Sequence, residues 1–245
     1  MLLKEISKID NAKILSRNRY VASHIPEYHF LSRASLRSML NKYHTVYLKP
    51  NNSCQGKGVI RIDRRSKHYL VKPRDRNKTY RLATIDSLMH CIQQEKMKRP
   101  YLIQRGIDSY TNKGRLFDIR SHLLRINGNW ELGAIIGRVA TKRGVTTNAY
   151  SGGTPVPIRP LLADHLGLDE KQQEIYIDEL TELSLQATKT FGKAFPKWTE
   201  FGLDIGIDKK GKLWIYEINI KPGMYVFRKD RPSHQRIMQM KKLKS

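Results

Sequence analysis

The chain has 245 residues, of which 46 are Lys or Arg and 22 are Asp or Glu, so its formal net charge is +24. With 39% hydrophobic residues, a chain of this length can bury a sizeable core in one large domain or two packed lobes, which argues against disorder. No run approaches the roughly 18 apolar residues of a membrane helix. The N-terminus mixes charges into its apolar positions, unlike a signal peptide. Two cysteines make neither a disulfide framework nor a Cys-based metal cluster, and we expect a cytoplasmic protein.

The positive charge implies anionic partners, and a nucleoside triphosphate, an anionic substrate, an acidic protein and nucleic acid all fit it. Residues 57–81 hold ten Lys or Arg and two acids, whereas residues 161–184 hold seven acids and one Lys. Aromatic residues are not interleaved through the basic stretches as single-strand stacking would require, and no zinc-finger spacing is present. Nucleic acid is therefore not expected as a partner, and a solvated basic surface remains the alternative.

The first half of the chain is predicted to alternate short strands with two helices. Residues 1–44 are polar and mixed, and we expect a helix around Arg33–Tyr43 because apolar residues recur there at helical spacing. A second helix, capped by Thr84, is predicted to reach Met97. Strands are predicted at Val46–Lys49, Val59–Asp63, His68–Lys72 and Pro100–Ile107.

The second half is predicted to hold two hairpins and one long helix. Asn127-Gly128 is a strong hairpin signal because both residues tolerate positive φ. The helix is predicted from Asp169 to Phe191, with Gly192 as its stop. The other predicted segments are strands Phe117–Arg125 and Trp130–Ala140, a loop at 141–160, and strands Thr199–Ile207 and Lys212–Ile220. Hairpins mixed with a few helices indicate an α+β fold with antiparallel sheets.

The first candidate site is the segment YLKPNNSCQGKG. A strand delivers Lys49, and Gly56 and Gly58 in the loop that follows allow backbone N–H groups to approach phosphate oxygens. The other polar residues that we place in this loop are Ser53, Gln55 and Lys57. The loop does not match GxxxxGK[ST], and a glycine-rich hairpin tip is the alternative. Lys72 also precedes a proline, but no glycines follow it, so we expect a structural role there.

The second candidate site lies in the last predicted hairpin. With an even-numbered turn, Asp204 would lie opposite Ile215, and it would share one face of the sheet with Glu217 and Asn219. The opposite face would carry Trp214, Tyr216 and Ile218. Two carboxylates and an amide oxygen are hard ligands that suit Mg²⁺ bound together with substrate phosphates. A solvent-facing polar side of the hairpin is the alternative.

Two arginines form the third candidate site. Arg120 and Arg138 lie on the strands that flank Asn127-Gly128, and Asp118 is two residues from Arg120. The guanidinium group keeps its charge and binds phosphate or carboxylate through two donors, so either arginine could serve catalysis. A structural Asp118–Arg120 ion pair, or a surface role for either arginine, is the alternative.

Together these motifs resemble the ATP-grasp superfamily, in which a strand ends in Lys-Pro before a Gly-rich loop. The resemblance implies that Gln104, Arg105 and Ile107 surround adenine, although Gln104 stands where many members have a carboxylate. It also implies that Asp204, Glu217 and Asn219 hold two Mg²⁺ ions. The implied fold is α+β, with two lobes whose antiparallel sheets enclose ATP, and without a full N-terminal substrate domain.

More narrowly, FDIR, the Trp130–Arg138 spacing, TTNAYSGG and EINIKPG resemble the YheC/YheD endospore coat-associated family over about residues 11–227. The resemblance implies an association with the spore. It divides the chain into an N-terminal helical segment (1–44), a small lobe with the phosphate loop and hinge strand (45–107), a large lobe with the metal site (108–227) and a basic tail (228–245).

The function implied is that of an ATP-dependent ligase, which phosphorylates a small-molecule or peptide carboxylate and couples it to an amine or thiol, releasing ADP and phosphate. Arg138, with Arg120, would stabilise the developing negative charge. Asn148 would shape the substrate side, and a partner protein would supply a substrate domain. The alternatives are a catalytically quiet ATP-grasp scaffold or spore-associated binding protein and, from charge alone, a nucleic-acid binder.

Overall fold

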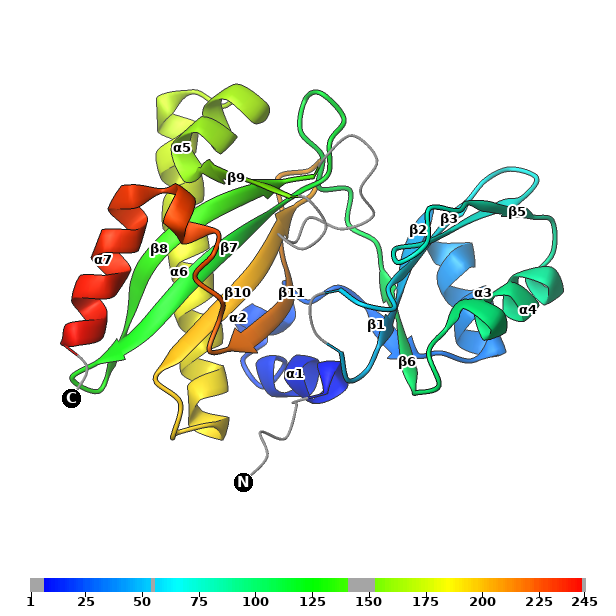
Figure 1. Ribbon diagram of the computed structural model, residues 1–245, viewed down its shortest axis with the longest axis horizontal. Helices are drawn as coiled ribbons and strands as arrows, with labels where there is room; N and C mark the ends of the chain where they lie inside the picture. Colours follow the sequence, from blue (N-terminus) through cyan, green and yellow to red (C-terminus); the bar gives the residue numbers. More distant parts are fainter. Residues whose placement is uncertain (1–6, 54–55, 141–152, 244–245) are drawn as a thin grey trace. The chain divides into compact units, whose positions relative to one another are not determined.

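The computed structural model describes residues 7–53, 56–140 and 153–243 (Figure 1). The chain divides into two compact units. Unit 1 contains residues 1–10, 26–107 and 143–146, and unit 2 contains residues 11–25, 108–142 and 147–245. Two antiparallel sheets with helices make the fold α+β, as predicted.

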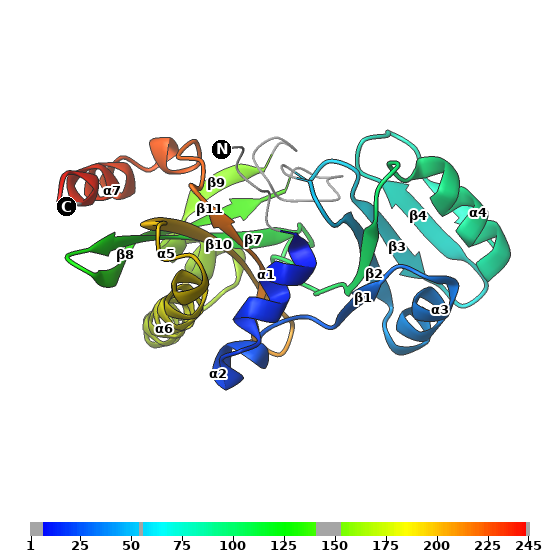
Figure 2. The ribbon, with the colours of Figure 1, turned by 90° about the horizontal axis from the view of Figure 1, so that it is seen from below.

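Unit 1 is a six-stranded sheet in the order β1-β6-β2-β3-β4-β5. Its strands are β1 (Tyr28–Phe30), β2 (Thr45–Pro50), β3 (Ile60–Arg64), β4 (Tyr69–Pro73), β5 (Tyr80–Leu82) and β6 (Tyr101–Arg105). Two helices, α3 (Arg33–Lys42) and α4 (Ile85–Glu95), pack their apolar residues on one face of this sheet (Figure 2). The predicted helices and strands of this region are confirmed to within about two residues at each end.

Alternation along β2 separates the two faces of the unit 1 sheet. Val46 and Leu48 are buried in the core beneath the helices, so Tyr47 and Lys49 lie on the opposite face, which we call the open face. Both helices begin at a capping box, with Ser32 at the start of α3 and Thr84 at the start of α4, as predicted for Thr84. The open face of unit 1 is therefore the one on which polar side chains collect.

Unit 2 is a five-stranded sheet in the order β11-β10-β7-β8-β9. Its strands are β7 (Phe117–Ile126), β8 (Asn129–Val139), β9 (Thr154–Pro157), β10 (Glu200–Ile207) and β11 (Leu213–Ile220). Its helical segments are α1 (Lys8–Leu15, from Asn11 onward), α2 (Arg19–Ala22), α5 (Ile158–Pro160), a π-helical turn (Leu161–His165), α6 (Glu170–Ala194), a 3₁₀ turn (Phe227–Lys229) and α7 (Arg231–Lys242). No described helix is long and apolar enough to cross a membrane.

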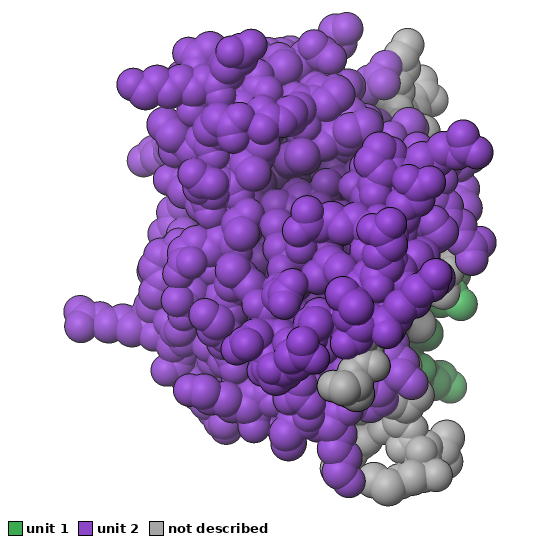
Figure 3. All heavy atoms as spheres, turned by 90° about the vertical axis from the view of Figure 1, so that its left-hand side faces the viewer, with its two compact units in different colours: residues 1–10, 26–107, 143–146 green, residues 11–25, 108–142, 147–245 purple. Residues whose placement is uncertain are grey.

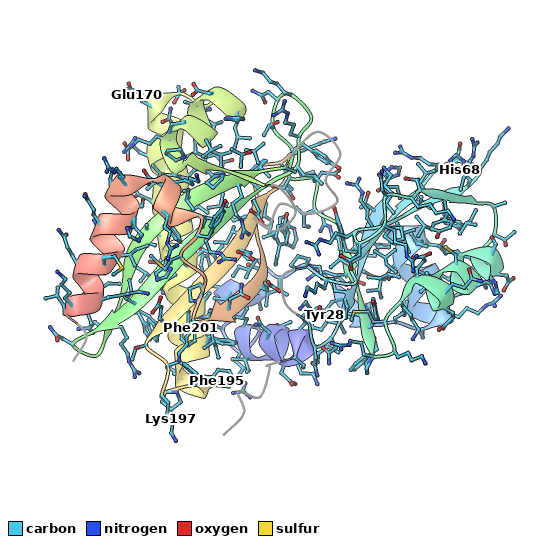
Figure 4. The ribbon with its side chains drawn as sticks, viewed as in Figure 1. Tyr28, His68, Glu170, Phe195, Lys197 and Phe201 are labelled. Atoms are coloured by element: carbon cyan, nitrogen blue, oxygen red, sulfur yellow. The ribbon has the colours of Figure 1, made fainter. Side chains whose placement is uncertain are left out.

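The helices α6 and α7 cover opposite faces of the unit 2 sheet (Figure 2). On the α6 side, Ser184 donates a hydrogen bond to Ser121 at 2.9 Å, and Phe201, labelled in Figure 4, packs between the rings of Phe191 and Trp130. On the other side, α7 and the 3₁₀ turn bury the apolar end of β7 and β8, and Figure 3 shows unit 2 from the side of α7. The rest of that second face carries the charged residues described below.

Three expectations about unit 2 and one about unit 1 need correction. Gly192 does not stop α6 but lies inside it, where a Cβ would come within 2.9 Å of Trp130, so the glycine allows close helix–sheet packing. The predicted loop at 141–160 contains β9, and the predicted basic tail contains α7, whose Ile237 is fully buried. The N-terminal segment is not only helical, because β1 pairs with β6. The strands β1 and β9 are too short to produce a periodic signal.

The outer edge of β11 is covered by backbone and side-chain groups from the start of unit 2. The side chain of Asn11 donates to the Ile218 carbonyl at 2.6 Å and accepts from the Ile218 N–H at 3.3 Å. The Ile215 N–H donates to the His24 carbonyl at 2.8 Å. An exposed strand edge invites pairing with other chains, so these contacts protect the strand that carries Glu217 and Asn219.

Candidate functional site

Four charged side chains from β7, β8 and β10 form a buried cluster on the face of unit 2 opposite α6. Arg120 Nε and Nη2 donate to the two carboxylate oxygens of Asp204 at 2.6 and 3.1 Å. Arg138 Nε and Nη2 donate to those of Asp118 at 2.7 and 2.6 Å, and Arg138 Nη2 also lies 2.9 Å from Asp204 Oδ1. The antiparallel register places Arg120 directly opposite Asp204, and Arg138 directly opposite Asp118, so the strand pairing itself builds the cluster.

The electrostatics of the cluster keep its charges in place. Burial alone would lower the pKa of the Arg138 guanidinium, but Asp118 and Asp204 outweigh it and raise that pKa. Burial alone would raise the pKa of Asp204, but Arg120 and Arg138 hold it below its ordinary value. Arg138 and Asp204 therefore remain charged at neutral pH, each stabilised by its oppositely charged neighbours.

A bulge in β11 changes the predicted register. The prediction that Asp204 lies opposite Ile215 is wrong, because Tyr216 is inserted as an extra residue and Asp204 pairs with Glu217. Trp214 was predicted on the face opposite Asp204, and this is also wrong. It pairs with Gly206, which lies two residues from Asp204 on β10 and therefore on the same face. Tyr216 lies over Gly206 as well, since a Cβ there would be 2.0 Å from the tyrosine hydroxyl.

The three predicted metal ligands nevertheless share one face. Asp204 and Glu217 are direct partners, and Asn219 pairs with Gly202, two residues along β10. Within the described ranges no three His, Cys, Asp or Glu side chains form a metal-binding group, so a cation here would rely on two carboxylates and an amide. The Asn219 Nδ2 is buried without a hydrogen-bond partner among the described residues. Asp204 Oδ1 accepts from both arginines, whereas Oδ2 accepts from Arg120 alone and keeps a second lone pair for a hard cation.

The open face of unit 1 brings two of the predicted nucleotide ligands together. Lys49 Nζ donates to Gln104 Oε1 at 2.5 Å, joining neighbouring strands β2 and β6. The Arg105 side chain does not join them, because its guanidinium lies over the Tyr43 ring, 5.1 Å from the ring centroid. Ile107 is buried. Only Lys49 and Gln104 of these residues are thus joined by a side-chain hydrogen bond on the open face.

The structure describes the Gly-rich loop except for residues 54 and 55. Gly56 and Gly58 both have positive φ, of 70° and 73°, which favours glycine at these positions. The Gly58 N–H donates to Asp75 Oδ2 at 2.5 Å, and Ser53 Oγ donates to the Lys57 carbonyl at 3.2 Å. The predicted Gln55 and Asn148 lie outside the described residues.

Sequence reasoning missed two contributors to this loop. Asp75 lies in a basic run. Its carboxylate accepts the hydrogen bond of the Gly58 N–H, which is the kind of loop donor that would bind a phosphate oxygen. Lys8 Nζ donates to the Ser53 carbonyl at 2.7 Å. The isolated acid between Arg74 and Arg76 was the only signal for Asp75, and no spacing pointed to Lys8, which lies 45 residues from Ser53.

Sequence reasoning also missed a buried histidine beside the charged cluster. His122 is fully buried, with Nε2 3.0 Å from Glu200 Oε1, and Lys241 Nζ lies 2.7 Å from the same oxygen. Burial lowers the pKa of His122 more than Glu200 raises it, so the imidazole is neutral at pH 7. The ring also packs edge-on against Phe227, so His122 joins the charged part of this face to its apolar part beneath α7.

Comparison with known proteins identifies relatives over nearly the whole chain. The model of the YheC/D-like ATP-grasp family matches residues 4–243. The endospore coat-associated protein YheD of Bacillus subtilis (strain 168) is 29% identical over 192 residues, which cover 76% of this chain and 41% of that protein. YheC of the same organism is 26% identical over 216 residues, covering 85% and 58%. The chain thus spans about half the length of these curated relatives.

Two solved structures with a similar fold are those of a ligase and a synthetase. The VanG D-Ala:D-Ser ligase of Enterococcus faecalis has a TM-score of 0.56 at 11% identity, covering 97% of this chain and 61% of that one. D-alanyl-alanine synthetase A of Vibrio cholerae has a TM-score of 0.54 at 16% identity, covering 96% and 64%. At these identities the likeness concerns the fold alone, and it confirms the predicted ATP-grasp fold. The family match also confirms the narrower resemblance: this chain belongs to the YheC/D-like ATP-grasp family.

Proposed function

We propose that this chain binds MgATP and uses it to join a carboxylate to an amine or thiol. The observation that carries the proposal is the charged part of the unit 2 sheet, where Asp204 and Glu217 are direct strand partners beside Asn219. Two arginines hold Asp204 in place from the same face. Buried opposite charges, beside an Asn219 Nδ2 donor with no hydrogen-bond partner in the described part of the chain, favour a site for a cation and its anionic ligand over a plain structural surface.

Unit 1 supplies the proposed nucleotide ligands. Lys49 is a point charge for the phosphates, and the buried Gly58 would offer its backbone N–H once the Asp75 carboxylate gives way. Gln104 can both donate and accept a hydrogen bond, as recognition of the adenine amino group and ring nitrogen requires. Its present bond to Lys49 keeps both side chains on the open face.

The proposed reaction needs no nucleophilic side chain. The substrate carboxylate attacks the γ-phosphorus of ATP, ADP leaves, and the acyl phosphate is attacked by the amine or thiol, which displaces phosphate. Arg120 and Arg138 provide positive charge for the oxygens that become negative in these steps, and they position Asp204. Mg²⁺ held by Asp204, Glu217 and Asn219 would neutralise charge on the transferred phosphoryl group.

Thermal melting with and without MgATP tests nucleotide binding. A ligand at 100 times its Kd adds about 2.7 kcal/mol to the free energy of unfolding, so we expect a rise in melting temperature of several degrees. Absence of any shift at saturating MgATP would contradict the nucleotide proposal. ADP release, measured against a panel of amino acids and peptides, then separates a ligase from a quiet scaffold, which would show the thermal shift without turnover.

The two lysines of unit 1 provide a sharper test of the phosphate site. We expect Lys49→Ala to raise the Kd for a fluorescent ATP analogue at least tenfold, because a charge-assisted hydrogen bond contributes about 1.5–3 kcal/mol. Lys72→Ala is the matched control: Lys72 also lies on the open face, but it lies 3.8 Å from Asp63 and no glycine loop follows it. Equal losses in both variants would show that Lys49 is not the phosphate ligand.

The cellular setting is proposed from the relatives. Both curated relatives are named for the endospore coat, and we propose that this chain is also associated with the spore. Fractionating sporulating cells and probing for the chain in the coat fraction tests this. A chain found only outside that fraction would contradict the proposal.

A further inference from the structure

A pocket of about 670 Å³ lies beside the turn of the β3–β4 hairpin in unit 1. The turn is closed by a hydrogen bond from the Arg65 N–H to the His68 carbonyl at 2.8 Å, and Figure 4 labels His68 at this tip. The basic and imidazole side chains that line the pocket are His44, Arg64, Arg65, Lys67 and His68. No Asp or Glu is among the residues that line it.

The pocket is separate from the proposed phosphate site of the same unit. The strand β3 begins at Ile60, two residues after Gly58, and ends at Arg64 in the pocket wall. Neighbouring β2 runs the other way, from Thr45, next to His44, to Lys49 and the Gly-rich loop. At about 3.3 Å per residue, the two sites lie roughly 15 Å apart at opposite ends of the sheet.

The cations of this pocket differ from other arginines of unit 1. Arg61 is paired with Asp63 at 2.8 Å, and Arg74 with Asp75 at 2.9 Å. Within the described ranges, no carboxylate lies within 4.0 Å of the charged groups of Arg64, Arg65 or Lys67. Three like charges in four successive positions repel one another, and a concave surface concentrates their field. A multivalent anion would relieve that repulsion.

His68 adds a neutral polar group to the same wall. Its Nδ1 is buried without a hydrogen-bond partner among the described residues. Burial, followed by the charges of Arg81 and Arg65, lowers the pKa of the imidazole. An anion bound here would oppose the effect of those arginines, so its binding should raise the pKa of His68.

We propose that this hairpin-tip pocket binds a small ligand that carries two or more phosphate or carboxylate groups, held by Arg64, Arg65 and Lys67. The volume is that of a small-molecule site, for which 300–1,000 Å³ is typical. A polynucleotide track would instead need a continuous groove with several aromatic platforms, and Tyr69 is the only Phe, Tyr or Trp that lines this pocket.

Calorimetric titration of inorganic triphosphate into the full chain, without Mg²⁺ and at about 0.15 M salt, tests the proposal, and citrate distinguishes a carboxylate ligand from a phosphate ligand. We expect Arg65→Gln/Lys67→Gln to weaken binding of the preferred anion at least tenfold. The matched control, Lys209→Gln/Lys210→Gln, removes two exposed charges from the β10–β11 turn and should change it less than twofold. Lys49→Ala should leave this binding event in place.

A second readout needs no variant of the pocket. The pKa of His68, followed by NMR, should rise when the anion binds. Equal weakening in both double variants would show diffuse charge attraction and overturn the proposal, as would loss confined to Lys49→Ala or an unchanged His68 pKa at saturation.

A single-stranded oligonucleotide that binds more tightly than both small anions, and loses its affinity in Arg65→Gln/Lys67→Gln, would also overturn it. MgATP should still raise the melting temperature of Arg65→Gln/Lys67→Gln. Failure of the pocket proposal can therefore be told apart from failure of the proposed function, which predicts that thermal shift.

Discussion

Glu217→Gln should reduce ATP turnover by at least 100-fold while the fold survives. The substitution keeps the size and hydrogen-bonding capacity of the side chain, but it removes one negative charge beside Asp204. A 100-fold loss corresponds to about 2.7 kcal/mol of transition-state stabilisation, which is the scale of a lost charge at a metal-assisted phosphoryl transfer. We expect the metal-free variant to be as stable as the parent or slightly more stable, because a carboxylate cluster loses one of its like charges.

The measurement combines ADP release with thermal melting on the same preparation, with and without Mg²⁺. Glu131→Gln is the matched control, since Glu131 is exposed on β8 of the same sheet, and it should leave both quantities unchanged. A destabilised metal-free Glu217→Gln protein with an unchanged response to Mg²⁺ would rule out the metal role. It would also remove the strongest support for the proposed function.

Local signals in the sequence predicted the elements that depend on local chemistry. The Asn127-Gly128 turn has φ values of 47° and 83°, as its residues indicated, and the Thr84 cap begins α4 where predicted. The bulge at Tyr216 had no such signal, because one inserted residue depends on how the ring packs over Gly206 on the neighbouring strand. Period-2 alternation assumes an unbroken ladder, so it placed Trp214 on the wrong face.

The pairing of charges was the part of the site that sequence spacing could not give. Asp118 and Arg120 are two residues apart on one strand and point to the same side, which suggested that they form a pair. Residues at i and i+2 are separated by about 6.6 Å, whereas directly opposed residues have Cβ atoms about 4.5–5.5 Å apart. Asp118 therefore pairs with Arg138, and Arg120 with Asp204. The Asn127-Gly128 signal made β7 and β8 neighbours, but it gave neither the register shift between His122 and Leu123 that sets Asp118 opposite Arg138 nor the place of β10 beside β7.

Arg138→Met should destabilise unit 2 by about 3–5 kcal/mol, which is the typical loss when one partner of a buried ion pair is removed. The Arg138 side chain is only 4% exposed, and its loss leaves Asp118 buried without the guanidinium that now binds both its oxygens. Asp204 would keep Arg120, so the cost falls mainly on Asp118. Urea unfolding, followed by tryptophan fluorescence, gives the free energy of unfolding for each variant.

Three further variants, Arg159→Met, Asp118→Asn and Arg138→Met/Asp118→Asn, decide whether the buried pair is the cause. Arg159→Met removes an arginine that lies 2.7 Å from Glu174, but both of those side chains are more than half exposed, so the loss should stay below about 1 kcal/mol. Arg138→Met/Asp118→Asn removes both buried charges and should recover part of the stability lost by Arg138→Met alone, because Asp118 no longer carries a buried charge that has lost its guanidinium. If the double variant instead equals the sum of the two single losses, the two residues act independently. The register of β7 and β8 would then hold the cluster together without help from its charges.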